Sequence, residues 1–342
     1  MIFFNRLLVK LIKLSNRLIF LSAFLLILIS SFAIYWLEPD TFGHPFNGFW
    51  WVMTTVTTVG YGDFYPHTVA GKLLAIILYI FGIGLISIII SKVIDSLFIY
   101  NRMKEAGKLR YMDENHFVMI GWTKNSEVAV HEILNTNASV EIVLIDNMKS
   151  TPISHNRVHY IHGNPVHKET LDMANIAKSK AVFIFAVDTT ENQNFIRDTS
   201  FIDGKTLLIA TSVERHFNHV YTIVEIKDKE NIMNFLHVKI DEFILGTETI
   251  AQLAVRSAFS PGTSKIVSQL LSTQEGEDLF EIKKRPHWDN YRDAFEELLL
   301  EGATLISDGE HMNINRRLDE RISETARLFV ICDQDTYMKL KQ

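Results

Sequence analysis

The sequence predicts a chain in two parts: an α-helical membrane module, then an α/β Rossmann-like domain that ends in a small α+β lobe. Two uncharged apolar runs lie within the first 100 of the 342 residues. The loop between these runs carries a glycine-containing pentapeptide at 58–62. Beyond position 113, apolar strand-like segments alternate with helical ones, which is typical of a parallel sheet with crossover helices.

Composition supports this division and excludes some partners. The chain is 47% hydrophobic and 22% charged, but most of the charge lies after position 100. A net charge of −6 without a basic stripe argues against a nucleic-acid partner. The single cysteine, Cys332, rules out an intrachain disulfide and fits a reducing cytosolic setting for the second part.

The membrane module is expected over 18–100, after a cytosolic N-terminus over 1–17. Its first apolar run predicts an outer helix over 18–37, because about 20 residues at roughly 1.5 Å each cross a hydrocarbon core about 30 Å thick. The second run predicts an inner helix over 70–100. A signal peptide is the competing interpretation of the first run, but no small-residue cleavage site follows it.

Flanking charges predict the orientation of a multi-pass protein of the cell (plasma) membrane. Basic residues precede the first run and follow the second, whereas the connecting loop is mainly acidic. The positive-inside rule therefore places both termini in the cytoplasm. No third run has Arg or Lys at every third position, so no voltage-sensor helix is expected. The basic residues in question are Arg6, Lys10, Lys13, Arg17, Lys92, Arg102, Lys104, Lys108 and Arg110.

The loop predicts a pore helix over 47–57, with Asn47 as its N-cap, followed by irregular backbone inside the membrane. Rings of carbonyl oxygens from four chains can replace the water shell of a potassium ion, and glycines allow the backbone to turn those oxygens inward. The predicted filter is Thr58, Val59, Gly60, Tyr61 and Gly62. Trp50 and Trp51 are candidates for an aromatic cuff around Tyr61. Asp63 lies at the outer mouth, where it either draws cations or holds the loop by hydrogen bonding.

Residues 18–100 resemble the pore module of two-helix potassium channels. That resemblance implies a homotetramer with potassium ions in the filter, because one chain supplies one filter strand. Trk-type transporters are the nearest rival, but they fuse four such units in one chain and relax the filter glycines.

The inner helix carries a candidate gate. The resemblance implies a gating hinge at Gly82 or Gly84, and close packing against another helix is the alternative use of these glycines. Asp95 shares a helix face with Ser87 and Ser91. Four copies of Asp95 would form an acidic ring at the inner mouth, unless this carboxylate is only a solvated charge beyond the membrane.

The second part divides into a linker over 101–113, a Rossmann-like lobe over 114–246, a helical crossover or dimerisation segment over 247–273 and a small lobe over 274–342. This organisation resembles the TrkA-like RCK domain, the regulator of potassium conductance. The resemblance implies that four or eight domains form a gating ring, whose change of shape on ligand binding opens the inner helices. Extra soluble copies could be translated from Met103 or Met112.

The gating ligand is left open. A nucleotide or another small ligand is expected near Gly121 and Asp146, although only the first glycine of the dinucleotide fingerprint is present. Asp146 is equally well a helix cap or a turn residue. In calcium-gated relatives three carboxylates bind the ion; by that resemblance only Glu225 retains one here, since Ala186 and Lys227 hold the other positions. No calcium site of that type is expected.

Weaker candidates remain in the second part. The acids Asp188, Glu191, Asp198 and Asp203 form either another cation site or a solvated loop. Scattered histidines could give the gate a pH response. An oxidoreductase and a regulator of a separate pore are the rival functions; the incomplete glycine turn opposes the first and the complete filter opposes the second. The predicted function is a potassium-selective, ligand-gated channel subunit, not an enzyme.

Overall fold

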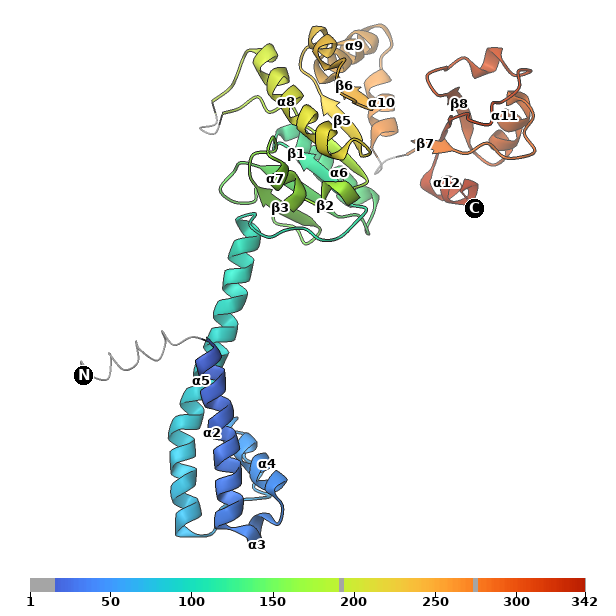
Figure 1. Ribbon diagram of the computed structural model, residues 1–342. Coiled ribbons are helices and arrows are strands. Elements are labelled where there is room, and N and C mark those ends of the chain that lie inside the picture. Colours follow the sequence, from blue (N-terminus) through green and yellow to red (C-terminus); the bar gives the residue numbers. More distant parts are fainter. Residues whose placement is uncertain (1–15, 191–193, 273–275, 342) are drawn as a thin grey trace. The chain divides into compact units, whose positions relative to one another are not determined.

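The computed structural model describes residues 16–190, 194–272 and 276–341, and the chain forms two compact units that divide between Met103 and Lys104. Most of the predicted N-terminal segment over 1–17, with its basic residues Arg6, Lys10 and Lys13, lies outside the described residues, as does Glu191. Element labels below are those of Figure 1.

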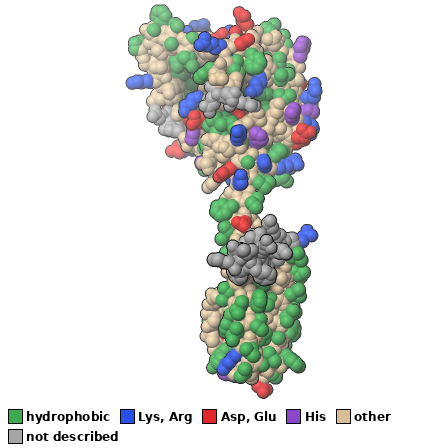
Figure 2. All heavy atoms as spheres, turned by 90° about the vertical axis from the view of Figure 1, so that its left-hand side faces the viewer, with side chains coloured by type: hydrophobic (Ala, Val, Ile, Leu, Met, Phe, Trp, Pro, Cys, Tyr) green, Lys and Arg blue, Asp and Glu red, His purple; other side chains and the backbone are tan. Residues whose placement is uncertain are grey.

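Helices are the regular secondary structure in the described part of the first unit. It contains α2 (Asn16–Leu37), α3 (Pro39–Phe42), α4 (Pro45–Val56) and α5 (Val69–Glu105), with α2, α4 and α5 side by side (Figure 1). The segments Arg17–Leu37 and Val69–Glu105 are long and apolar enough to cross a membrane. Apolar side chains cover the face of this unit that Figure 2 shows, as expected of a surface that meets lipid or other subunits.

A small core joins α4 to the two long helices. Ile34, Trp51, Val52 and Leu78 are at most 4% exposed in it. Gly48 allows the closest approach, because a Cβ atom there would lie 2.5 Å from the carbonyl oxygen of Ser31 on α2. The pore helix is therefore fixed against the outer helix by backbone contact as well as by side-chain packing.

The second unit begins with a six-stranded, all-parallel sheet. Its order is β3-β2-β1-β4-β5-β6, which places β1 and β4 side by side at the topological switch point. The strands are β1 (Phe117–Ile120), β2 (Ile142–Asp146), β3 (Val158–His162), β4 (Ala181–Ile184), β5 (Tyr221–Glu225) and β6 (Glu242–Ile244). This topology confirms the predicted Rossmann-like fold.

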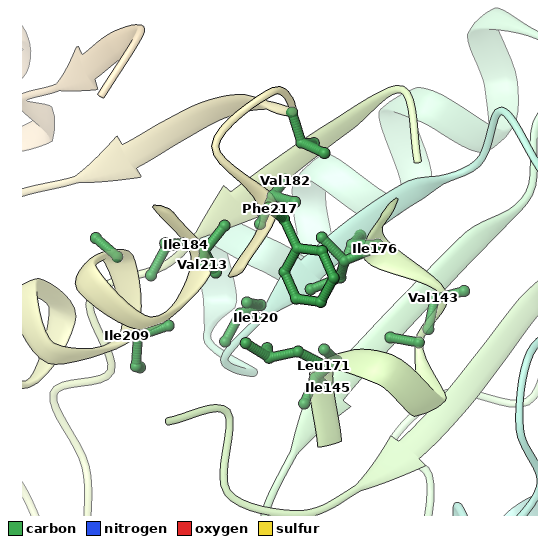
Figure 3. Packing of buried hydrophobic residues seen from close by; sticks show 14 of the residues in the cluster. Ile120, Val143, Ile145, Leu171, Ile176, Val182, Ile184, Ile209, Val213 and Phe217 are labelled. Carbon is green, nitrogen blue, oxygen red and sulfur yellow. The ribbon is translucent and has the colours of Figure 1, made fainter. Parts of the chain in front are cut away.

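Helices cover both faces of this sheet, because alternate residues of each strand point to opposite sides. On β1, Val118 and Ile120 pack with residues of α7 (Lys168–Met173) and α8 (Thr199–Phe217), whereas Met119 packs with α6 (Lys124–Thr136). Figure 3 shows the ring of Phe217 among the apolar side chains of the first cluster. Short 3-10 segments, η1 (Ile176–Lys178) and η2 (Lys229–Phe235), complete this lobe.

The helices α9 (Gly246–Phe259) and α10 (Thr263–Leu271) follow, and neither has a buried residue. The last lobe pairs β7 (Asp278–Ile282), β9 (Leu328–Cys332) and β8 (Thr304–Asp308) into an antiparallel sheet. Its core includes Trp288 and Tyr291 at 1% and 2% exposure. Its remaining elements are α11 (Tyr291–Leu300), η3 (Ile314–Arg316) and α12 (Gln334–Leu340). This lobe confirms the predicted α+β class.

Candidate ion pathway and ligand site

The pore helix begins earlier than the sequence predicts. Pro45 occupies the first turn of α4, and His44 is the N-cap, its Nδ1 accepting a hydrogen bond from Phe46 N at 3.1 Å. Asn47 lies inside the helix and donates from Nδ2 to the carbonyl oxygen of Phe42 at 2.6 Å. The predicted cap was wrong because proline, preset for the first helical position, starts the helix two residues upstream of Asn47.

The predicted filter backbone adopts conformations that suit inward-turned carbonyls. Thr58, Gly60 and Gly62 have φ values of 63°, 55° and 79°. The amides of Val59 and Gly60 both donate to the carbonyl oxygen of Thr54, at 2.8 and 3.1 Å. The C-terminal end of α4, where the helix dipole is negative, therefore holds the start of this segment directly.

Trp50 contacts the predicted filter and the residue that follows it. Its indole ring stacks on Tyr61, with 5.8 Å between ring centroids and 4° between planes. Its Nε1 donates to Oδ2 of Asp63 at 2.8 Å, which supports the hydrogen-bonding alternative for Asp63. Trp51 points elsewhere: it is 4% exposed and packs edge-on against Phe42. Within one chain, Trp50 therefore contacts Tyr61 and Trp51 does not.

Sequence reasoning missed Glu38, a buried carboxylate directly after α2. Its oxygens accept hydrogen bonds from Thr68 Oγ1 at 2.6 Å, Thr68 N at 2.8 Å, His67 N at 2.9 Å and Thr41 Oγ1 at 3.1 Å. Burial raises the pKa of Glu38, but these hydrogen bonds together hold it below its ordinary value. The one available signal was an acid directly after an apolar run.

The two inner-helix glycines have different surroundings. A Cβ atom on Gly82 would lie 2.8 Å from Cγ2 of Val56 on the pore helix, whereas Gly84 has open space around it. Helix α5 is continuous from Val69 to Glu105. The packing alternative therefore has direct support at Gly82. Asp95 is exposed on α5 in the single chain.

The candidate nucleotide residues meet at the carboxyl ends of β1 and β2. Oδ2 of Asp146 accepts a hydrogen bond from Trp122 N at 2.7 Å, so this carboxylate fixes the turn after β1. Gly121 has a φ of 92°, and a Cβ atom there would lie 2.6 Å from Val187. Thr123 and Ser126 cap α6 reciprocally. The glycine is thus required by the approach of the segment after β4 to this turn.

Glu225 lies at the carboxyl end of β5 and is 6% exposed. It accepts hydrogen bonds from Asn125 Nδ2 at 2.8 Å, Ala186 N at 3.0 Å and Lys227 Nζ at 3.2 Å. Lys227 Nζ also lies 3.5 Å from Asp188. The lysine ammonium thus supplies positive charge between the two carboxylates. The absence of a calcium site stays a prediction.

Asp198 and Asp203, the other acidic candidates among the described residues, make hydrogen bonds that stabilise the lobe. Asp198 caps α8 through Ser200 N and Phe201 N, and the 1%-exposed Asp203 accepts from Lys227 N at 2.9 Å and Asn231 Nδ2 at 2.7 Å. Among the residues that the structure describes, no group of three or more His, Cys, Asp or Glu side chains could hold a metal ion.

Comparison with known proteins agrees with this geometry. Residues 22–98 match an ion channel family, and residues 134–224 match the calcium-activated potassium channel slowpoke-like RCK domain. The "Putative potassium channel protein YugO" of Bacillus subtilis is 31% identical over 228 residues, which cover 66% of this chain and 67% of that protein.

Two solved channel structures align with the chain at low sequence identity. The human SLO3 gating ring aligns with 66% of this chain and 46% of its own at 13% identity, with a TM-score of 0.51. The GsuK channel bound to NAD aligns with 93% of this chain and 57% of its own, also at 13% identity, with a TM-score of 0.47. The chain thus spans less than two thirds of either solved chain.

These comparisons exclude the enzyme interpretation of the Rossmann-like lobe. The pore module matches ion channels, and the lobe matches a domain that accompanies potassium channels. Identity above 30% over two thirds of a relative, together with both family matches, identifies the chain. It belongs to the potassium channels that join a two-helix pore module to an RCK domain.

Proposed function

We propose that four copies of this chain assemble around a potassium-selective pore in the cell membrane, with 58–62 of each copy as the filter and both termini in the cytoplasm. The observation that carries this proposal is the run of positive φ values at Thr58, Gly60 and Gly62, anchored to the C-terminal end of the pore helix. Carbonyls turned to one side by such a backbone can replace the water shell of a potassium ion.

The exposure of the filter side chains supports an assembly. Val59 and Tyr61 are 53% and 69% exposed in the single chain. Neighbouring copies would cover these side chains and close the ring of carbonyls. One copy cannot surround an ion, because its filter is a single strand.

A ring of RCK domains would gate this pore through α5 and the linker. Helix α5, which contains the predicted inner helix, is continuous from Val69 to Glu105. A force on its C-terminal end would therefore be transmitted along the inner helix. The exposed apolar residues of α9 and α10 support pairing with a second RCK domain, from another subunit or from a soluble copy. They include Ile250, Val255, Phe259, Ile266 and Leu271.

The ligand would bind in the crevice outside β1 and β4, near Gly121 and Asp146. This crevice lies at the topological switch point, where open α/β sheets bind ligands. The capped N-terminus of α6 points a helix dipole toward it, which favours an anionic group such as a nucleotide phosphate. Calorimetry of the purified protein with ADP, ATP and NAD tests this assignment; no heat with any of them would remove it.

Flux from liposomes tests the channel itself. Purified protein should release potassium faster than sodium, and Gly60→Ala should abolish the preference because φ at that position is 55°. Gly309→Ala is the matched control, since that glycine also has a positive φ but lies in the last lobe. Equal passage of sodium and potassium, or no flux at any pH with any of these nucleotides, would contradict the proposal.

A further inference from the structure

The start of the second unit is clamped by several hydrogen bonds. We call residues 106–115 the linker segment. Leu109 O accepts from His159 Nε2 at 2.7 Å, and Gly107 O accepts from His162 N at 3.0 Å. Tyr111 N donates to Met173 O at 2.9 Å. The linker segment between α5 and β1 is therefore bound to the surface of the lobe by hydrogen bonds.

Tyr111 is the central side chain of this clamp. It is 5% exposed, and its hydroxyl donates to Oε2 of Glu141 at 2.7 Å. Its ring centroid lies 4.5 Å from that of His116 and 5.4 Å from that of His159. The aromatic ring of the linker segment is thus packed against two imidazoles of the lobe.

His116 is buried in a form that has no place for a second proton. It is 1% exposed, and its Nε2 lies 2.9 Å from the carbonyl oxygen of Ala174, so Nε2 carries the hydrogen. Its Nδ1 is buried and has no hydrogen-bond partner. A proton added at Nδ1 would therefore place an unpaired donor and a charge inside the lobe.

The groups around His116 determine whether a fall in pH favours the packed or the released form of the linker segment. They are Tyr111 and Asp113 from the linker segment, Glu141 before β2, His159 on β3 and the Ala174 carbonyl after α7. Burial lowers the pKa of His116, although the Ala174 carbonyl, Glu141 and Asp113 act in the opposite direction. A lowered pKa means that the released imidazole binds a proton more readily than the packed one, so acid favours release.

We propose that His116 and Tyr111 form a pH-sensitive latch, which holds the linker segment on the lobe at neutral pH and releases it when His116 is protonated. Protonation favours exposure of the imidazole to water. The Tyr111 ring, which packs on this imidazole, then loses that contact. The linker segment then separates from the lobe, so a movement of the RCK domain is no longer transmitted to α5. This last step rests on the proposed channel function, whereas the latch itself does not.

Hydrogen exchange of the full-length protein in detergent micelles at pH 7.5 and 5.5 tests the latch. The reporters are the amides of Tyr111 and Asn115, which bond to Met173 O and Lys178 O. Their protection factors, corrected for intrinsic exchange, should fall by up to about tenfold at pH 5.5, the limit for releasing an imidazole of ordinary pKa near 6.5. Unchanged wild-type protection at both reporters would overturn the proposal without any variant.

Variants identify the titrating group. His116→Gln should keep the bond to Ala174 and lose the pH-dependent fall, and His116→Phe serves in its place if the glutamine variant does not fold. His219→Gln is the matched control, because His219 also contacts a backbone carbonyl, Ala177 O at 3.0 Å, but is exposed. A fall that persists in the His116 variants, or disappears in the control, would overturn the latch.

Potassium flux at the same two pH values separates the latch from the channel proposal. Wild-type flux should change between pH 7.5 and 5.5, and the His116 variants should lose most of that change. Absence of flux at both pH values with ADP, ATP and NAD would contradict the channel and leave the exchange result standing. A flux response equal in wild type and His116 variants would overturn the latch as a control of the pore.

Discussion

The indole Nε1 of Trp50 donates a hydrogen bond to Oδ2 of Asp63 at 2.8 Å, and the same ring stacks on Tyr61. One side chain of α4 thus contacts both Tyr61, in the proposed filter, and the turn that follows it. The bond joins positions 13 residues apart, on either side of the proposed filter over 58–62. The segment proposed as the filter is therefore supported by specific side-chain contacts in addition to the fold of the loop.

Trp50→Phe should weaken ion selection while leaving the pore folded. Phenylalanine retains a ring to stack on Tyr61 but removes the donor to Asp63, a loss of about 1 kcal/mol, or roughly fivefold in an equilibrium. The measurement is the ratio of potassium to sodium flux from liposomes. Trp36→Phe, at an 82%-exposed position on the outer helix, is the control and should leave the ratio unchanged.

Glu38→Gln should destabilise the outer loop by about 2 kcal/mol, because four donors converge on this carboxylate and an amide oxygen accepts more weakly. Since the pKa is lowered, the stabilisation is complete above the ordinary carboxyl pKa and disappears as pH falls through the lower folded value. Thermal unfolding between pH 3 and pH 7 measures this. Asp40→Asn, at an exposed acid nearby, should keep the wild-type pH dependence.

Gly82→Ala should disturb the pore through overpacking, at a cost of about 1–3 kcal/mol, because its Cβ would meet Val56 at 2.8 Å. Val56→Ala should relieve that contact, so the double variant should recover stability and flux relative to Gly82→Ala. Gly84→Ala, which meets no atom within 4 Å in the chain, is the comparison. Lack of rescue in the double variant would favour a hinge at Gly82.

A soluble copy that begins at Met103 should be more stable than one that begins at Met112. The shorter copy lacks Tyr111, whose ring is 5% exposed and whose hydroxyl bonds to Glu141. Loss of a buried aromatic ring costs about 3–5 kcal/mol. Urea unfolding of the two fragments provides the comparison; equal midpoints would show that Tyr111 contributes little to the isolated domain.

Micromolar calcium should leave potassium flux unchanged, because Lys227 already supplies a positive charge to Glu225 and Asp188. Glu225→Gln should likewise produce no calcium response, although it should lower stability, since Glu225 is 6% exposed and accepts three hydrogen bonds. A steep rise of flux with calcium that disappears in Glu225→Gln would show that the ion binds there.

The sequence by itself determined the fold class and the two long apolar helices, and it supplied the proposal for the filter. Long uncharged runs and the glycines at 60 and 62 are local signals, readable without knowing which residues touch. The same holds for the alternating strands that predicted the parallel sheet. The sequence was less informative where local signals compete: Pro45 moved the helix start away from Asn47. No bounds were predicted for α8 (Thr199–Phe217) or α12 (Gln334–Leu340).

Only the tertiary structure decided which side chains meet. Glu38 and Thr68 lie 30 residues apart, and Asn125 and Glu225 lie 100 apart, yet each pair shares a hydrogen bond. The orphaned Nδ1 of His116 and the seat of Tyr111 are likewise products of packing. Burial and hydrogen-bond partners depend on which distant segments pack together. The periodicity of residues along the chain does not specify that packing.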